Sequence, residues 1–257
     1  MIRNYAGSIK RTLKNRSYYS KKRKYVLSFF KEFGYNRVKP FNLDKWHHDL
    51  DLFTAFDKLG DEVFIKFTKL ERLLKNENRA YKIMQQNTVL KNHIIEHKEY
   101  IKSKGFRALV LKLSKGIVLN EDWMVNNIEK LGALIRIVDE FKNLSLVHRD
   151  LKLDNFIYED GNIKIFDFSF MIDKTERRKP KEIDLKSREN ILKLVNLGMY
   201  YKPEPLKWDD YYSLYIIFNN LLKNKSLILS LEQKDILSRH AEECKGKIDT
   251  NSYTILK

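Results

Sequence analysis

The sequence predicts a mixed α+β fold, with a strand-rich amino-terminal part followed by a helical carboxy-terminal part. Two apolar runs, Leu50–Phe56 and Val63–Ile65, flank a polar turn at residues 59–62, which is typical of a hairpin. A compact apolar run at Ala108–Leu113 indicates a further, buried strand. After residue 128 helical spacing dominates, so the strands come early and the helices late.

Three helices are predicted from the spacing of apolar side chains. Residues 1–34 form the first, which ends at Gly34 and carries its apolar positions at Tyr25, Val26, Phe29, Phe30 and Phe33. Residues 70–86 form the second, and residues 128–141 form the third, a core helix. Two short strands, Asn155–Tyr158 and Ile163–Phe166, make a hairpin within the helical part.

The composition is that of a globular protein. The chain has 257 residues, enough for one large domain or two small lobes, and 43% of them are hydrophobic. Its one cysteine, Cys244, rules out an internal disulfide framework and fits a reducing compartment. The sequence shows neither an apolar stretch of signal-peptide type nor a run of membrane-spanning length. We therefore expect a protein that is either soluble and cytoplasmic or attached only peripherally to the inner membrane face.

Positive charge is concentrated at the amino terminus. The formal net charge is +16, and residues 1–40 hold twelve Lys or Arg side chains against one acid, Glu32, which accounts for +11 of it. Such a segment is either a solvated helix face or a patch for an anionic partner, namely nucleic acid, acidic lipid headgroups or a phosphorylated glycan. Composition alone does not separate these readings.

Residues 148–156 contain the groups that a phosphoryl transfer needs. The segment reads His-Arg-Asp-Leu-Lys-Leu-Asp-Asn-Phe, with Asp150 and Asn155 five residues apart. Phosphoryl transfer requires a carboxylate that orients the attacking hydroxyl and accepts its proton, and oxygen ligands for Mg²⁺. The segment resembles the catalytic loop of eukaryotic-type protein kinases, and this resemblance implies Asp150 as the carboxylate, Asn155 as a metal ligand and Lys152 as a charge near the transferred phosphate.

A second acidic motif, Asp167-Phe168-Ser169, follows Asn155 by twelve residues. The segment at 148–156 resembles the catalytic loop of eukaryotic-type protein kinases, and this motif resembles their metal-binding Asp-Phe-Gly, with Ser169 in place of glycine. The resemblance implies that Asp167 bridges Mg²⁺ to the phosphates of ATP. Because Ser169 lacks the backbone freedom of glycine, the resemblance leaves open whether the motif flips between two arrangements.

The amino-terminal half resembles the same family more weakly. Val63-Phe64-Ile65-Lys66 is similar to the strand whose lysine holds the α- and β-phosphates. A helical glutamate should pair with Lys66, and the candidates are Glu77, which has the better local context, and Glu71. The glycine-rich loop of ordinary protein kinases is missing, because residues 41–59 contain no glycine.

Two later segments extend the resemblance. Leu197–Glu204 is similar to the end of an activation segment, with Lys202-Pro203-Glu204 standing for Ala-Pro-Glu. The following segment, Trp208–Leu214, is similar to the helix whose buried aspartate braces the backbone of the catalytic loop, which places that role on Asp210. Asp210 could equally be an acid at a helix amino terminus, favoured by the helix dipole.

Taken together, the motifs resemble the protein-kinase-like superfamily over about residues 50–215. The resemblance implies a bilobal fold with a basic helical extension at 1–34, a strand-rich lobe at 35–114 and a helical lobe at 115–257. It implies ATP and Mg²⁺ as cofactors.

The acceptor of the phosphate is open at this stage, because one fold serves many substrates. The basic amino terminus and the departures from the glycine loop and Asp-Phe-Gly favour a kinase similar to the small bacterial lipopolysaccharide-core kinases of heptose and Kdo, which phosphorylate an anionic glycan or glycolipid. Alternatives are a compact Ser/Thr protein kinase, favoured by Arg149 and by Thr175 and Ser187, an aminoglycoside-type phosphotransferase, and a pseudokinase that acts only as a binding module. Nucleic acid is the less expected partner.

Overall fold

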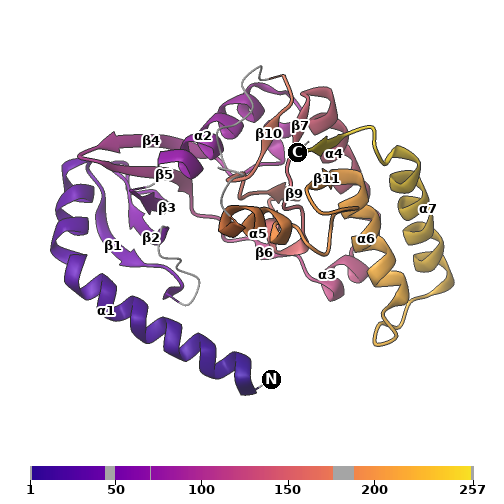
Figure 1. Ribbon diagram of the computed structural model, residues 1–257, viewed down its shortest axis with the longest axis horizontal. Coiled ribbons are helices and arrows are strands. Elements are labelled where there is room, and N and C mark those ends of the chain that lie inside the picture. Colours follow the sequence, from indigo (N-terminus) through magenta and orange to yellow (C-terminus); the bar gives the residue numbers. More distant parts are fainter. Residues whose placement is uncertain (1, 44–49, 70, 176–187, 256–257) are drawn as a thin grey trace. The chain divides into compact units, whose positions relative to one another are not determined.

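The structure is a computed structural model that describes residues 2–43, 50–69, 71–175 and 188–255 (Figure 1). The chain divides into two compact units. The first contains residues 1–78 and 95–114, and the second contains residues 79–94 and 115–257. Helix α2 (Glu71–Gln86) contributes its residues 71–78 to the first unit and 79–86 to the second.

The first unit is built on a five-stranded antiparallel sheet with the order β1-β2-β3-β5-β4. Its strands are β1 (Asn36–Pro40), β2 (Asp51–Phe56), β3 (Glu62–Thr68), β4 (His97–Ser103) and β5 (Phe106–Lys112). Strands β2 and β3 form a hairpin around Gly60, whose φ of +87° lies in the left-handed region that glycine adopts without strain. In the centre of the sheet Lys66 of β3 lies opposite Leu52 of β2 and Leu109 of β5.

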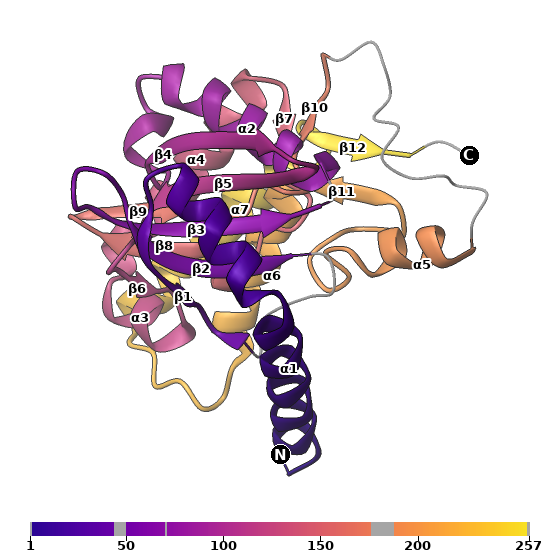
Figure 2. The same ribbon diagram turned by 90° about the vertical axis from the view of Figure 1, so that its left-hand side faces the viewer.

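One long helix, α1 (Ile2–Glu32), lies across a face of this sheet (Figure 2). Its side chains Val26, Phe29 and Phe30 are at most 2% exposed, and they share one core cluster with Phe53 and Phe67 of the sheet. The rings of Phe29 and Phe30 each lie 5.2 Å from that of Phe67. Lys22 of α1 also pairs with the buried Asp51 of β2. The apolar face of α1 is therefore part of the core of the first unit.

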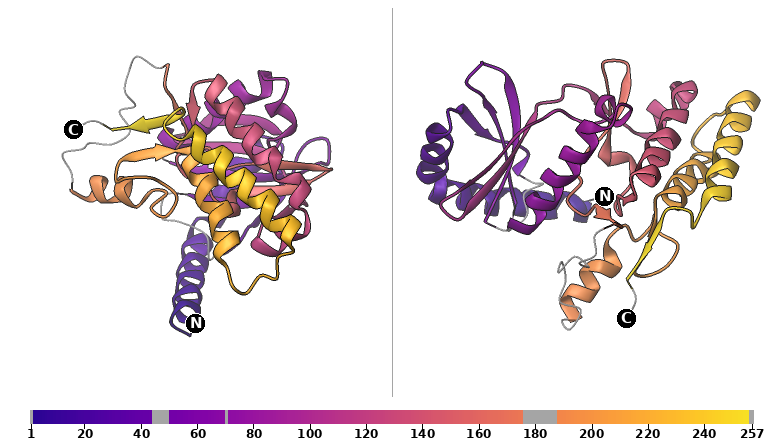
Figure 3. Two further views of the ribbon diagram at one scale, coloured as in Figure 1. Left: turned by 90° about the vertical axis from the view of Figure 1, so that its right-hand side faces the viewer. Right: turned by 90° about the horizontal axis from the view of Figure 1, so that it is seen from above.

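The second unit is mainly helical (Figure 3). Its helices are α3 (Glu121–Asn126), α4 (Gly132–Asn143), α5 (Arg188–Asn196), α6 (Asp210–Lys223) and α7 (Leu231–Lys247). Its short strands are β6 (Ile117–Val118), β7 (Leu146–Val147), β8 (Phe156–Glu159), β9 (Asn162–Ile165), β10 (Ile172–Asp173), β11 (Lys207–Asp209) and β12 (Ser252–Thr254). They form the sheets β6-β8-β9, β10-β7 and β11-β12. Helices α6 and α7 lie side by side, and α4 packs against α6.

The predicted α+β class is confirmed, with a strand-rich amino-terminal sheet and a helical carboxy-terminal part. The first two predicted helices and both predicted hairpins are also present. The third predicted helix begins later than its periodicity indicates, because residues 128–130 form a 3₁₀ turn and α4 starts at Gly132. The predicted domain limits at 34/35 and 114/115 remain a prediction.

No helix in the described part of the chain combines the length and the apolarity needed to cross a bilayer.

Candidate active site

The candidate catalytic loop connects β7 to β8, and the first residue of α6 accepts a hydrogen bond from its backbone. Asp210, the first residue of α6, is fully buried, and its Oδ2 accepts a hydrogen bond of 2.8 Å from the amide of His148. This confirms the predicted bracing role of Asp210. Burial raises the pKa of Asp210 to about 7, against the opposing effect of the amide hydrogen bonds that it accepts. The loop backbone therefore rests on a carboxyl group that is costly to ionise.

Asp150 lies in this loop beside a lysine. Lys152 Nζ is 2.7 Å from Asp150 Oδ2, and the Asp150 side chain is only 14% exposed. Burial raises the pKa of Asp150 and the charge of Asp167 raises it further, whereas the hydrogen bond from Lys152 lowers it. Burial is the largest single effect on Lys152 and lowers its pKa, but the hydrogen bond to Asp150 and the charges of the nearby aspartates together outweigh it, so the pKa of Lys152 is raised. Asp150 is thus a carboxylate with a raised proton affinity next to a lysine whose own pKa is raised, which suits a group that accepts a proton from a hydroxyl.

Asn155 and Asp167 supply oxygen atoms near Asp150. Asn155 is 4% exposed, and its Nδ2 donates to the backbone oxygen of Asp150 at 2.7 Å. Since the amide nitrogen is used in this way, Oδ1 of Asn155 is the atom left to face a cation. The backbone oxygen of Asn155 in turn accepts from the amide of Phe166 at 3.0 Å, which ties the loop to the segment that carries Asp167.

Asp167 has an unusual backbone and a hydroxyl partner. Its φ of +65° is left-handed, which is uncommon for a residue other than glycine and is found where function demands a set side-chain direction. Ser169 Oγ donates to Asp167 Oδ1 at 3.0 Å, a contact that glycine could not make. No pattern in the sequence indicates this hydrogen bond.

Phe168, between these two residues, is fully buried. Its ring lies 4.9 Å from that of Tyr81 on α2, in an edge-on arrangement, and 5.4 Å from that of His148. The ring of Phe141 on α4 lies 6.5 Å away. These aromatic contacts pack the Asp-Phe-Ser motif against Tyr81, Phe141 and His148.

The residues at this site can supply only part of the coordination shell of Mg²⁺, so a bound nucleotide and water would have to supply the rest. The described residues contain no group of three His, Cys, Asp or Glu side chains that could enclose a metal. One carboxylate and one amide oxygen, from Asp167 and Asn155, are the kind of ligands with which proteins hold Mg²⁺ when phosphate oxygens and waters complete its octahedron. The residues present therefore fit a metal that arrives with a nucleotide.

Lys66 and Glu77 form a buried ion pair in the first unit. Lys66 Nζ lies 2.8 Å and 3.0 Å from the two carboxylate oxygens of Glu77, and these residues are 6% and 0% exposed. Lys66 lies on β3 and Glu77 on α2. The structure thus pairs Lys66 with Glu77, whereas the side chain of Glu71 lies outside the described residues.

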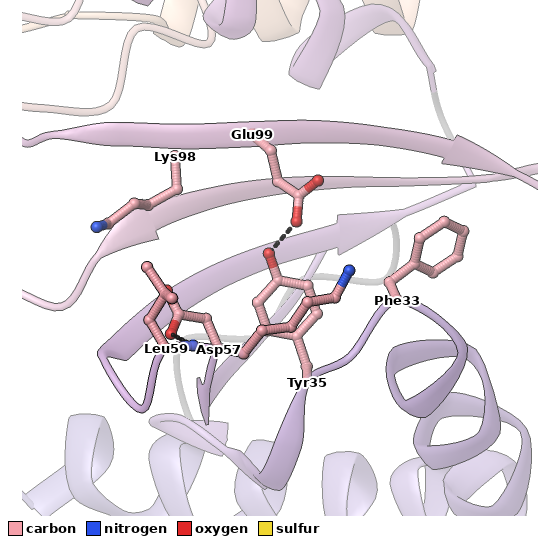
Figure 4. A pocket seen from close by; sticks show the side chains of 7 residues that line it. Phe33, Tyr35, Asp57, Leu59, Lys98 and Glu99 are labelled. Atoms are coloured by element: carbon pink, nitrogen blue, oxygen red, sulfur yellow. Dashed lines mark hydrogen bonds between the residues drawn. The ribbon is translucent and has the colours of Figure 1, made fainter.

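None of the predicted site residues lines a hollow in the first unit (Figure 4). It is lined by Phe33, Tyr35, Asp57, Lys58, Leu59, Lys98 and Glu99. The hydroxyl of Tyr35 donates to Glu99, and Asp57 Oδ1 accepts from the amides of Leu59 and Asp61 at 2.9 Å. Because its polar groups bind one another, we interpret the hollow as the joint between α1, the β2–β3 turn and β4.

The structure brings Asp150, Lys152, Asn155 and Asp167 into one hydrogen-bonded neighbourhood of the second unit, and Lys66 with Glu77 into the first. It also reveals contacts that sequence reasoning missed. Arg79 pairs with Asp173 at 2.6 Å, and Asp173 accepts from the hydroxyl of Thr175. Arg79 and Asp173 lie 94 residues apart in the sequence, so no local pattern could have joined them. Ser187, named above in favour of a Ser/Thr protein kinase, lies outside the described residues.

Comparison with known proteins supports the fold. The sequence matches no protein-family model and no curated protein. The structure resembles the crystal structure of the kinase domain of PF14_0431, with a TM-score of 0.53 and 14% identity. The match covers 74% of this chain and 63% of that domain, so the chain spans less than two thirds of the neighbour's length. The fold is therefore protein-kinase-like.

Proposed function

We propose that this chain is an ATP-dependent, Mg²⁺-assisted kinase that phosphorylates a hydroxyl of an anionic glycan, in particular a lipopolysaccharide-core sugar. The observation that carries the phosphoryl transfer is the arrangement of Asp150 beside Lys152 and Asn155, with Asp167 close enough to raise the pKa of Asp150. This is the set of groups that positioning and charge stabilisation require in a reaction that needs little covalent help.

Each residue has a distinct task in this proposal. Asp150 orients the acceptor hydroxyl and takes its proton, while Lys152 stabilises the negative charge on the moving phosphate. Asn155 and Asp167 hold the metal, and Ser169 keeps the Asp167 carboxylate in place. Lys66, set by Glu77, binds the α- and β-phosphates. Bound Mg²⁺ would supply neutralisation of the phosphate charge.

The solvent face of α1 supports an anionic acceptor at a membrane surface. Between residues 12 and 31 the helix contains no acid, and its exposed side chains include Lys14, Arg16, Lys21, Arg23, Lys24 and Lys31. Each such cation near an anionic leaflet contributes about 1 kcal/mol of binding. Since the apolar face of α1 is buried in the first unit, the helix is expected to bind such a surface by charge rather than by insertion.

The acceptor is tested with labelled ATP supplied to separated protein and lipopolysaccharide fractions. We expect label in the lipopolysaccharide fraction that depends on Mg²⁺ and is absent with Asp150→Asn. Label found only in protein would overturn the glycan acceptor and favour a compact Ser/Thr protein kinase. An absence of any transfer and of any ATP hydrolysis would favour a pseudokinase.

A further inference from the structure

Arg149, which directly precedes Asp150, lies in an aromatic environment. It is 3% exposed, and its guanidinium carbon lies 5.3 Å from the ring centroid of Trp208 and 5.9 Å from that of Tyr253. Its Nε donates to the backbone oxygen of Phe170 at 2.5 Å. A guanidinium over aromatic faces is attracted by their negative charge, and the attraction is stronger where water is excluded.

Trp208 is the centre of this arrangement. It is 1% exposed, its Nε1 donates to the backbone oxygen of Leu197 at 2.9 Å, and Lys202 Nζ lies 4.8 Å from its ring. Lys202 Nζ also donates to three carbonyl oxygens at the end of α5, those of Leu194, Val195 and Leu197. We call Arg149, Lys202, Trp208 and Tyr253 the Trp208 cluster.

The end of the activation segment approaches the catalytic loop closely at this cluster. Gly198 has a φ of +65°, and a Cβ there would lie 2.7 Å from the backbone oxygen of Arg149. Real Cβ atoms do not come so near a backbone oxygen, so the approach depends on glycine. The Trp208 cluster therefore joins two segments that lie about fifty residues apart.

The carboxy-terminal strand β12 completes the cluster. Tyr253 pairs with Trp208 across the β11–β12 ladder, with ring centroids 6.4 Å apart. Two residues earlier the fully buried Asn251 donates to the backbone oxygen of Leu146 at 2.9 Å and accepts from Lys174 Nζ at 2.8 Å. Residues 251–254 thus contact three parts of the second unit. These are β7, which leads into the catalytic loop, Lys174, which follows β10, and β11.

In kinases regulated by phosphorylation, a phosphate on the activation segment orders that segment by pairing with arginine. Here a phosphate could reach Arg149 only if its guanidinium left the Phe170 carbonyl and the two rings. We propose that the Trp208 cluster takes the place of such a phosphate, so that Tyr253 and Trp208 are positioning residues that set Asp150 without any modification of the chain. The effect of the cluster on ATP turnover rests on the proposed kinase function. Its effect on the order of the catalytic loop does not.

The catalytic consequence is tested by removing phosphate from the wild-type protein with a phosphatase and confirming its mass. We expect the rate of ATP turnover to stay within about twofold of that of the untreated protein. For comparison, a tenfold change in rate corresponds to ~1.4 kcal/mol of activation free energy. A fall of tenfold or more on dephosphorylation would overturn the inference and leave the proposed kinase activity standing.

The structural consequence is tested by amide hydrogen exchange in Tyr253→Ala, which needs no activity and so separates this inference from the proposed function. We expect exchange at residues 146–150 to be about tenfold faster than in wild type, while β8 and β9 are unchanged. Tyr253→Phe, which keeps the ring, should behave as wild type, and so should Tyr200→Ala, which removes an exposed ring nearby. Equal exchange in Tyr253→Ala and Tyr200→Ala would overturn the inference.

Discussion

The buried pair of Lys66 and Glu77 yields a prediction about stability that needs no substrate. Replacing one partner of such a pair leaves the other as an uncompensated charge in the interior. We expect Lys66→Met to lower the free energy of unfolding by about 3 kcal/mol, measured by chemical denaturation. Adding Glu77→Leu to Lys66→Met should restore part of that loss, because the isolated carboxylate is then gone.

The matched control is Lys69→Met, since Lys69 is an exposed lysine just beyond the same strand. It should change the free energy of unfolding by less than about 0.5 kcal/mol. The contradicting result is a double variant that is less stable than Lys66→Met by as much as Glu77→Leu alone is less stable than wild type. The two side chains would then not be coupled, and the pairing would be wrong.

Asp210 predicts a dependence of stability on pH. Its pKa is about 7 in the folded protein and near 3.8 in an unfolded chain, so between these values the folded state holds a proton that the unfolded state has released. The contribution of Asp210 to the free energy of unfolding is therefore present at low pH and is lost as pH rises from about 4 to about 7.

Asp210→Asn removes this titration and keeps an oxygen for the His148 amide. The difference in unfolding free energy between wild type and Asp210→Asn should shift against wild type as pH is raised from 4.5 to 7.5. Parallel curves over that range would show that Asp210 titrates as an exposed aspartate does.

At the scale of single residues, candidate site residues could be identified from the sequence where function demands a fixed local spacing. Asp150 and Asn155 could be singled out because both lie in one short loop. The choice between Glu71 and Glu77 depends on how a helix lies against a strand, which spacing alone does not determine. Tyr253 was not found, since its contacts with Arg149 cross about a hundred residues of chain.

At the scale of elements, the exposed lysines of α1 predict binding to anionic membranes. Lys21, Lys24 and Lys31 are exposed and lie on one side of the helix, being three and seven residues apart. We expect the triple change of these lysines to Gln to weaken binding to liposomes that contain phosphatidylserine by at least tenfold, because about 1 kcal/mol is lost per cation. Co-sedimentation at low salt measures this, and added salt should weaken wild-type binding as well.

The control replaces Lys223, Lys225 and Lys234 by Gln, which changes the net charge equally on exposed positions of the second unit. Equal losses in both variants would mean that total charge, and not the face of α1, determines binding. Deleting residues 1–34 is the poorer test, because it would also uncover Phe53 and Phe67 of the sheet.

Elements with a regular apolar pattern could be predicted, and those without one could not. The helices α1 and α2 and the β2–β3 hairpin have such patterns. Strand β1 has only polar or half-buried positions, and in β4 a single residue of seven is buried, so neither shows the alternation that marks a strand. Their pairing with neighbours in the sheet, rather than their own composition, makes them strands.

At the scale of the whole molecule, the fold class was predictable because the order of strands and helices and the kinase-like motifs agree with each other. The identity of the phosphate acceptor was not predictable from the sequence, since it depends on surfaces that differ among proteins of the same fold. The +16 charge and the basic face of α1 are the grounds on which we propose an anionic partner, but they do not identify it.

The most direct test of the central claim is Mg²⁺-dependent ATP turnover by the wild type, Asp150→Asn and Asp154→Asn. Asp154 is an exposed aspartate four residues along the same loop, so it matches the chemical change, and its charge is the smallest of the effects that raise the pKa of Lys152. We predict that Asp150→Asn lowers turnover by about a hundredfold or more, with the KM for ATP little changed, and that Asp154→Asn lowers it by less than about threefold. Turnover that survives intact in Asp150→Asn would contradict the assignment of this loop as the catalytic site.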